Sequence, residues 1–250
     1  MVHQQPALPV LYFRSILFWL GFATFTFVFA LLLVLSFPFP LEKRFALTHG
    51  WSTATIWWLR ISCHLDYEVS GAKNIPDKAG IIFAKHQSTW ETLILNFWFE
   101  KQSWVIKREL LWVPIFGWGM YMMNPIALNR RAGKKAIDQL VDQGRERLEK
   151  GNWIVIFPEG TRTAPGTKGR YRIGGAILAE RTGAAITPIA HNAGEYWPRR
   201  SFIKRPGVIK ICIGPSIETN NKSAHEILAE AEQWIESEMA RITTLKAVRD

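Results

Sequence analysis

The stretch GIIFAKHQSTWETLILNFWF, which runs from Gly80 to Phe99, contains a complete transition from strand to helix. Its first part, Gly80–Ala84, is short and apolar, as in a buried strand, and its last part, Trp90–Phe99, has the length and apolar content of a helix. The same alternation recurs along the chain. Strands separated by helices are typical of a mixed, largely parallel sheet covered by helices, so we expect an α/β fold.

The other expected strands are short apolar runs, and helical patterns lie between them. The strands are predicted at Tyr67–Ser70, Gly80–Ala84, Ser103–Ile106, Trp153–Phe157, Ala185–Ala190 and Val208–Ile213. The helices are predicted at Trp90–Phe99, Gly133–Lys150, Gly174–Thr182 and Lys222–Ile242. The last helix is expected to begin behind Asn220 and Asn221 as caps. Its acidic side chains are expected to form a solvated face: Glu226, Glu230, Glu232 and Glu236.

The amino-terminal part of the chain carries no charged residue from Ser15 to Leu41. Pro38 and Pro40 end any helix there, so the helical part has about 22 residues and a length of roughly 33 Å, enough to cross the apolar core of a bilayer. A cleaved signal peptide and a helix buried in a soluble core are the alternatives. Signal peptides usually have a shorter apolar region and a small-residue cleavage site, so we expect a retained membrane anchor.

A second apolar stretch, Phe45–Cys63, is interrupted by polar residues such as His49 and Arg60. This pattern is typical of an amphipathic helix in the membrane interface. The anchor is therefore either a single span or a helical pair embedded in one leaflet, and the pattern does not separate the two. We expect residues 1–64 to form the membrane anchor and interfacial helix, and residues 65–250 to form the α/β domain.

The composition limits the class of protein. Hydrophobic residues make up 48% of the chain and charged residues 21%, which excludes a disordered or collagen-like chain. The two cysteines, Cys63 and Cys212, give no metal-binding spacing and no disulfide framework, so a reducing compartment is expected. No metal cofactor is predicted.

The charge of the chain is strongly positive, with 31 Lys and Arg against 21 Asp and Glu and a formal net charge of +10. Most of these cations follow the apolar run, so the positive-inside rule places the bulk of the chain on the cytoplasmic side. The excess of positive charge favours contact with anionic lipid and binding of an anionic substrate. Because no nucleic-acid motif accompanies it, we expect no nucleic-acid partner.

His86 stands directly after the expected strand Gly80–Ala84 and just before a helix, a position at which a side chain is exposed and well oriented. An imidazole suits proton transfer near neutral pH. The carboxylate of Glu91, in the first helical turn, can bind one ring nitrogen and leave the other free to take a proton. The alternative is structural, because Ser88 and Glu91 also have the spacing of a capping box.

A second candidate site, FPEGTR at Phe157–Arg162, follows the apolar strand WIVIF. Ligands in open α/β sheets usually lie after such strands. Gly160 permits a tight turn, Thr161 offers a hydroxyl, and Arg162 offers a planar charged fork that suits a phosphate. The alternative is an ordinary turn with a surface arginine.

His86 with Glu91, followed by FPEGTR, resembles the sequence blocks of the glycerolipid acyltransferase family. A second block is matched by Ala127–Arg130, a fourth in part by Ile186–Ile189, and a basic element of the family by Val105–Leu110. Three residues depart from the usual pattern, which has Asn, Asp and an acidic residue at these places: Lys85, Glu91 and Asn129. The resemblance covers about residues 65 to 217.

The resemblance implies transfer of a fatty acyl group from an acyl thioester to the sn-2 hydroxyl of 1-acyl-glycerol-3-phosphate. His86 would act as general base, with Glu91 orienting its ring, and no acyl-enzyme is needed. The acceptor phosphate would be bound by Lys107, Arg130 and Arg162, with Glu159, Gly160 and Thr161 as further substrate-binding residues. Glu159 is expected to orient Arg162 or to contact the acceptor. Backbone N–H groups at the helix start after His86 are candidates for stabilising the oxyanion.

The family pattern leaves several properties open. The donor is either acyl-CoA or acyl-carrier protein, no further cofactor is expected, and the oligomeric state is unknown. The enzyme is expected at a bacterial inner membrane with its catalytic domain on the cytoplasmic side. The segment Leu110–Met123 is a tunnel wall for the acyl chain, a membrane-facing surface, or ordinary core. Two alternative functions are acyl transfer to another lysolipid acceptor and membrane lipid binding without catalysis. The proposed chemistry requires the His86 ring and the Glu159–Arg162 turn to share one site.

Overall fold

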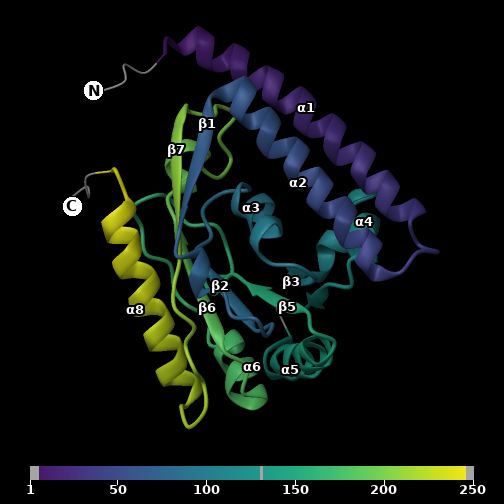
Figure 1. The fold of residues 1–250 in the computed structure, drawn as a ribbon, viewed down its shortest axis with the longest axis vertical. Coiled ribbons are helices and arrows are strands. Elements are labelled where there is room, and N and C mark those ends of the chain that lie inside the picture. The colour runs from purple at the N-terminus through teal and green to yellow at the C-terminus, as the bar shows by residue number, and fades with distance from the viewer. Residues whose placement is uncertain (1–5, 130–131, 246–250) are drawn as a thin grey trace.

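The computed structural model describes residues 6–129 and 132–245, and these form one seven-stranded sheet in the order β1-β7-β6-β2-β5-β3-β4 (Figure 1). The strands are β1 (Leu65–Ser70), β2 (Ile81–Ala84), β3 (Gln102–Lys107), β4 (Ile126–Leu128), β5 (Trp153–Ile156), β6 (Ile186–His191) and β7 (Gly207–Ile213). All neighbouring pairs are parallel except β6 and β7, which are antiparallel. The predicted mixed, largely parallel sheet is confirmed.

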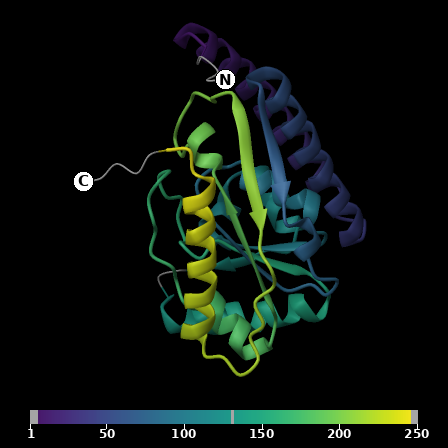
Figure 2. The same ribbon diagram turned by 60° about the vertical axis from the view of Figure 1, so that its left-hand side comes forward.

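Helices cover both faces of the sheet. The α-helices are α1 (Leu8–Leu35), α2 (Leu41–Cys63), α3 (Glu91–Trp98), α4 (Phe116–Met122), α5 (Lys134–Glu149), α6 (Gly174–Thr182), α7 (Ala193–Tyr196) and α8 (Ala224–Ile242), and the 3-10 helices are η1 (Ala72–Asn74) and η2 (Arg108–Trp112). Figure 2 shows α8 along one face of the sheet and the α1–α2 pair beyond the other.

The two faces of the sheet bury different side chains of the same strands, because side chains alternate along a strand. Ile81 and Phe83 of β2 pack with α5, α6 and α8, whereas Ile82 and Ala84 pack with α2 and α3. All four are fully buried. This two-sided burial explains why β2 is a continuous apolar run in the sequence rather than an alternating one.

The long apolar run forms α1, which at 28 residues is about 42 Å long and starts earlier than predicted, with a proline in its first turn. It is the one helix of the described chain that is long and apolar enough to cross a membrane, and it is mostly exposed, which makes it a candidate membrane anchor. α1 and α2 lie side by side in opposite directions (Figure 1).

α1 also packs against the rest of the chain near both of its ends. Near its start, the Ser15 hydroxyl accepts a hydrogen bond from the backbone N–H of Lys204 at 2.9 Å, and the Trp19 indole donates to the Phe202 carbonyl at 3.0 Å. Near its end, Ala30 of α1 lies against Gly119 of α4. A Cβ atom added to Gly119 would lie 3.4 Å from the backbone of Ala30, so the two helices approach closely here. α1 therefore lies along the molecule instead of projecting from it.

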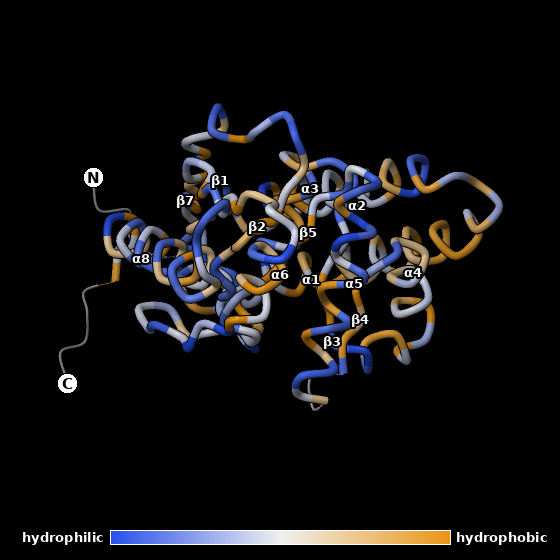
Figure 3. Tube along the Cα trace, turned by 90° about the horizontal axis from the view of Figure 1, so that it is seen from below, coloured by the Kyte–Doolittle hydropathy of each residue, from blue (hydrophilic) through white to orange (hydrophobic). Residues whose placement is uncertain are grey.

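The segment predicted as Leu110–Met123 forms the end of η2 and α4, and most of its large apolar side chains are exposed. Trp112 is 77% exposed, and Trp118 and Tyr121 are also on the surface. Ordinary core packing is therefore wrong for these side chains. Figure 3 shows hydrophobic colour gathered on the side of the molecule where α4 lies.

The carboxyl ends of five strands meet at one edge of the sheet, because β6, β2, β5, β3 and β4 all run in the same direction. His86 follows β2, the FPEGTR segment follows β5, Lys107 ends β3, and Asn129 follows β4. The topology thus brings the predicted site segments to one edge.

Candidate active site

His86 and Glu91 form a hydrogen-bonded pair at the start of α3. Nδ1 of His86 lies 2.8 Å from Oε1 of Glu91, and the Glu91 side chain is buried while the His86 side chain is 15% exposed. Burial alone would raise the pKa of Glu91, but the His191 and His86 rings and the Ser88 N–H lower it below its ordinary value. An ionised Glu91 holds the proton on Nδ1 of His86 and leaves Nε2 as the acceptor.

Glu91 also closes the turn that precedes α3. It accepts hydrogen bonds from the backbone N–H groups of Gln87 and Ser88 at 2.9 to 3.1 Å. The Ser88 hydroxyl accepts a hydrogen bond from the Trp90 N–H at 3.2 Å and not from the Glu91 N–H. The capping box is therefore only half formed, since only the bond from the Ser88 N–H to the Glu91 carboxylate is present. The catalytic and the structural interpretation of Glu91 are therefore compatible. The expectation that these amides stabilise an oxyanion is wrong for Gln87 and Ser88, because both already donate to Glu91.

The ring of His86 lies against the FPEGTR segment. It stacks on Phe157 with the ring centroids 3.9 Å apart and the planes 10° from parallel. The His86 carbonyl accepts a hydrogen bond from the Thr163 N–H at 2.8 Å. The requirement that both motifs share one site is met.

Within FPEGTR, the backbone turns at Gly160, whose φ of 69° lies in the left-handed region that glycine adopts without strain. The Thr161 hydroxyl is exposed and accepts a hydrogen bond from Nη1 of Arg199 at 3.4 Å, and the Arg162 carbonyl accepts from the same atom at 3.2 Å. Nε of Arg162 is buried and has no partner among the described residues.

Glu159 is placed differently from the other members of the segment. Its carboxylate is fully buried and lies 2.7 Å from Nζ of Lys85, while its second oxygen accepts the His86 backbone N–H at 3.0 Å. Among the described residues, no hydrogen bond joins Glu159 to Arg162. The expected orientation of Arg162 by Glu159 is therefore wrong.

One predicted phosphate ligand, Lys107, lies on a strand next to β5. Lys107 is exposed at the end of β3, which is hydrogen-bonded to β5, and Trp104 of the same strand lies 5.9 Å from the Phe157 ring. Arg130 lies outside the described residues. In the second block, Ala127 pairs with Ile106 and Leu128 pairs with Lys107, so this part of the block lies beside the end of β3.

Two residues near His86, His191 and Lys85, were not predicted as site residues from the sequence. His191 in β6 is fully buried, its Nε2 donates to the Lys85 carbonyl at 2.8 Å, and its Nδ1 accepts the Ala193 N–H at 3.3 Å. Burial lowers the pKa of His191 below its ordinary value, although the nearby Glu91 carboxylate opposes this shift. Lys85 was visible only as a departure from the family pattern.

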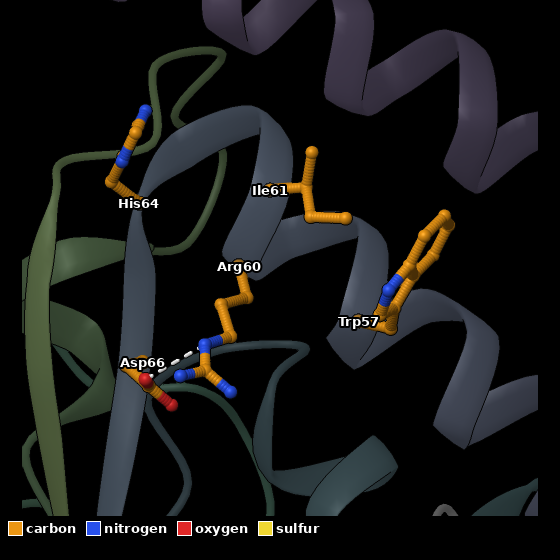
Figure 4. Close-up of a pocket in the computed structure, with 5 residues that line it drawn as sticks. All are labelled: Trp57, Arg60, Ile61, His64 and Asp66. Carbon is orange, nitrogen blue, oxygen red and sulfur yellow. Dashed lines mark ion pairs between the residues drawn. The ribbon is translucent and has the colours of Figure 1, made fainter.

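A hollow of about 620 Å³ lies elsewhere, on the outer side of α2 and β1 (Figure 4). It is lined by Trp57, Arg60, Ile61, His64 and Asp66. Arg60 and Asp66 form an exposed ion pair at 3.0 Å. None of the predicted site residues lines this hollow. The described residues also contain no group of three or more His, Cys, Asp or Glu that could hold a metal ion.

Comparison with known proteins gives an independent view of the site. Residues 66–192, which include both motifs, match the acyltransferase family. The chain is 42% identical over 238 residues to the 1-acyl-sn-glycerol-3-phosphate acyltransferase of Pseudomonas aeruginosa, covering 93% of each chain. It is 30% identical over 206 residues to the Saccharomyces cerevisiae protein of the same name, covering 79% of this chain and 66% of that one.

The fold is also similar to a solved structure. The 1-acyl-sn-glycerophosphate acyltransferase of Thermotoga maritima superposes with a TM-score of 0.76, over 93% of this chain and 96% of the other. The two sequences are 18% identical, so this likeness concerns the fold alone.

Proposed function

The chain belongs to the acyltransferase family, and on that premise we propose that it acylates the sn-2 hydroxyl of 1-acyl-glycerol-3-phosphate to form phosphatidic acid. The observation that carries the proposal is the His86–Glu91 pair stacked against FPEGTR, at an edge of the sheet that also bears Lys107. The relatives at 42% and 30% identity are named for this reaction, which supports the choice of acceptor. As the chain is an enzyme of this class, a lipid-binding protein without catalysis is set aside.

The proposed chemistry begins with the acceptor hydroxyl, which is a weak nucleophile until a base removes its proton. Nε2 of His86 takes that proton while the hydroxyl oxygen attacks the carbonyl carbon of the acyl thioester. The carboxylate of Glu91 stabilises the resulting imidazolium. The C–S bond then breaks, the proton passes from the imidazolium to the sulfur, and the ester and a free thiol are released. No covalent acyl-enzyme intermediate forms at any step.

The acceptor phosphate is proposed to bind at the end of β5 and its neighbours. Arg162 offers a guanidinium whose Nε has no partner among the described residues, and an arginine fork matches two phosphate oxygens. Lys107 adds a second cation from β3, and Arg130 is proposed as a third. Gly160 and Thr161 would contribute the turn that places Arg162.

The lipid substrate requires a membrane beside the site. We propose that α1 anchors the enzyme and that the exposed side chains Trp112, Trp118 and Tyr121 meet the same bilayer, because aromatic side chains favour the membrane interface. The net charge of +10 suits the anionic cytoplasmic leaflet, where the catalytic domain is placed by this proposal. The division into an anchor, 1–64, and an α/β domain, 65–250, stays a prediction. So does the use of acyl-CoA or acyl-carrier protein as donor without a further cofactor.

The test is an acceptor panel with the purified enzyme in mixed micelles. A labelled acyl thioester is supplied with lysophosphatidate, lysophosphatidylethanolamine, lysophosphatidylcholine or lysophosphatidylglycerol, and both the lipid product and the released thiol are measured. We expect labelled phosphatidate and an equal amount of thiol with lysophosphatidate, at least about tenfold faster than with the other acceptors. A clear preference for another lysolipid would show that lysophosphatidate is not the acceptor. Binding of lysophosphatidate without release of thiol would refute the proposed acyl transfer.

A further inference from the structure

Lys85 is a buried cation directly before His86. Its side chain is 1% exposed, and Nζ lies 2.7 Å from Oε1 of Glu159 and 2.8 Å from Oε1 of Glu236. A third contact joins Nζ to the Thr167 carbonyl at 3.4 Å. A fully buried lysine is rare unless it is paired, and here two carboxylates share it.

Glu236 reaches this cation from α8, the helix nearest the carboxyl terminus. It therefore lies outside residues 66–192, the part that matches the family. Its side chain is 22% exposed, and Oε1 also accepts the Tyr171 hydroxyl at 2.8 Å. Burial and the nearby Glu236 carboxylate raise the pKa of the Tyr171 phenol, so it remains a donor. The expected solvated face of α8 is wrong at Glu236, because this position faces the site.

Glu159 connects the buried cation to the backbone of His86. One oxygen, Oε1, faces Lys85 and also accepts the Thr163 hydroxyl and the Gly169 N–H, both at 3.2 Å. The other oxygen, Oε2, accepts the His86 backbone N–H at 3.0 Å. The contacts thus run from α8 through Lys85 and Glu159 to the main chain of His86.

We propose that Lys85 and Glu236 are positioning residues for acyl transfer, which together fix Glu159 so that it holds the His86 backbone in place. The inference rests on the proposed function. It also assigns Glu159 to the support of His86 rather than to the substrate, since its carboxylate is fully buried. Placing the base correctly matters, because a displacement of about 1 Å at a reacting group can slow a reaction by about 10²-fold.

The first test replaces Glu236 with Gln, which keeps the size and removes the charge. We expect kcat to fall about 5- to 30-fold, with KM unchanged for both substrates, because substrate contacts are intact and only the placement of His86 suffers. The matched control is Glu232→Gln, one turn earlier on α8, where the carboxylate pairs with the exposed Lys168. This control should keep kcat within about twofold.

The second test uses Lys85→Met and the double variant Lys85→Met with Glu236→Gln. The single change leaves the buried Glu159 carboxylate and the partly exposed Glu236 carboxylate without their cation, and we expect kcat to fall about 10²-fold. Removing the second charge relieves that repulsion, so the double variant should recover at least about fivefold of kcat. A role limited to general stability would instead lower the Tm of the variants and leave kcat per folded enzyme unchanged.

Several outcomes would overturn the proposal. These are a wild-type kcat in Glu236→Gln, a loss that appears in KM instead of kcat, or a double variant slower than Lys85→Met. If Lys85→Met fails to fold, Glu236→Gln with its control decides alone. Wild-type enzyme that does not acylate lysophosphatidate would refute the proposed function, whereas an active wild type with equally active variants would refute only the positioning role.

Discussion

His86 is held at two different atoms by two different carboxylates. Glu91 binds Nδ1 of the ring, and Glu159 binds the backbone N–H. Phe157 covers one face of the ring at 3.9 Å, which restricts its rotation. The side chain is therefore fixed in orientation while remaining partly exposed, which is what a general base needs before it meets a substrate hydroxyl.

Glu91→Gln tests the electrostatic part of this arrangement. The amide keeps the shape of the side chain but loses the negative charge that stabilises the protonated ring, and it no longer specifies the proton on Nδ1. We expect kcat to fall about 10²- to 10⁴-fold at neutral pH with little change in KM, as measured by initial rates of thiol release. An unaltered kcat would mean that Glu91 serves only the turn before α3.

Glu91 also makes the stability of the fold depend on pH. Its pKa lies below the ordinary value of 4.5, so the stabilisation it gives is fully present above about pH 4.5 and is lost as the pH falls through the lowered value. In detergent micelles, the free energy of unfolding of the wild type should therefore fall more steeply below pH 4.5 than that of Glu91→Gln. Glu149→Gln, an exposed position on α5, is the control and should follow the wild type.

The residues that the sequence revealed are those whose partners lie nearby in the chain. His86 and Glu91 are five positions apart, and FPEGTR is one continuous segment, so spacing and residue type were enough. Lys85 and Glu236 are 151 positions apart, and His191 meets Lys85 across 106 positions. No local pattern records such contacts, which is why Glu236 was expected on a solvated face.

Among the elements, the strands and the longer helices were predictable from apolar runs and helical spacing, and apart from the early start of α1 at Leu8 the predicted boundaries lie within a few residues of those observed. The elements that were not predicted are short. β4 has three residues, and α4 has seven within a segment rich in Trp, Met and Gly. α8 begins behind a capping box formed by Ser223 and Glu226, and not behind Asn220 and Asn221 as expected. Asparagine and serine are about equally good N-cap residues, and the reciprocal hydrogen bonds between Ser223 and Glu226 decide the start of α8.

The loop between α7 and β7 links α1 to the site. Lys204 in this loop is buried, and its ammonium lies 4.3 Å from the Trp19 ring and 5.0 Å from the Trp197 ring. Arg199 of the same loop donates to Thr161 and to the Arg162 carbonyl. One loop thus contacts both the candidate anchor and the turn proposed to hold the phosphate.

Lys204→Met tests the pH dependence of this packing. Burial lowers the pKa of Lys204 from 10.5 to about 7, so between these values the unfolded chain binds more protons than the folded one and stability rises with pH. The Tm of the wild type in micelles should be at least about 2 °C higher at pH 9.5 than at pH 7. Relative to the wild type, Lys204→Met should lose that rise. The same rise in both proteins would contradict the assignment.

At the scale of the whole molecule, β3 connects the candidate active site to the exposed apolar side chains of η2 and α4. Lys107 ends β3 and is followed at once by η2 and α4, whose aromatic side chains are exposed, while α4 itself contacts α1. The order of the strands could not be derived from the sequence, because it depends on pairings between distant segments such as β1 with β7. The exposure of α4 could not be predicted from the sequence either, since an apolar segment has the same composition in a protein core as on a membrane-facing surface.

Trp112→Ser combined with Trp118→Ser tests the proposed membrane contact. We expect binding to vesicles that contain phosphatidylglycerol to weaken by at least about tenfold, because two interfacial aromatic side chains are lost, while activity in mixed micelles stays within about threefold. Co-sedimentation with the vesicles measures the binding. Leu245→Ser is the control, because Leu245 is 47% exposed and follows α8, which lies on the opposite side of the molecule from α4 in Figure 1. Equal binding of all three proteins would remove α4 from the membrane surface.

The central claim is that Nε2 of His86 removes the proton of the acceptor hydroxyl, and the most direct measurement compares His86→Ala with the wild type. Both proteins are purified in the same detergent, their folding is compared by circular dichroism, and the formation of labelled phosphatidate is followed at saturating substrates. The account predicts a rate at least about 10³-fold lower for a normally folded His86→Ala. A folded variant that forms phosphatidate at a rate near that of the wild type would contradict it.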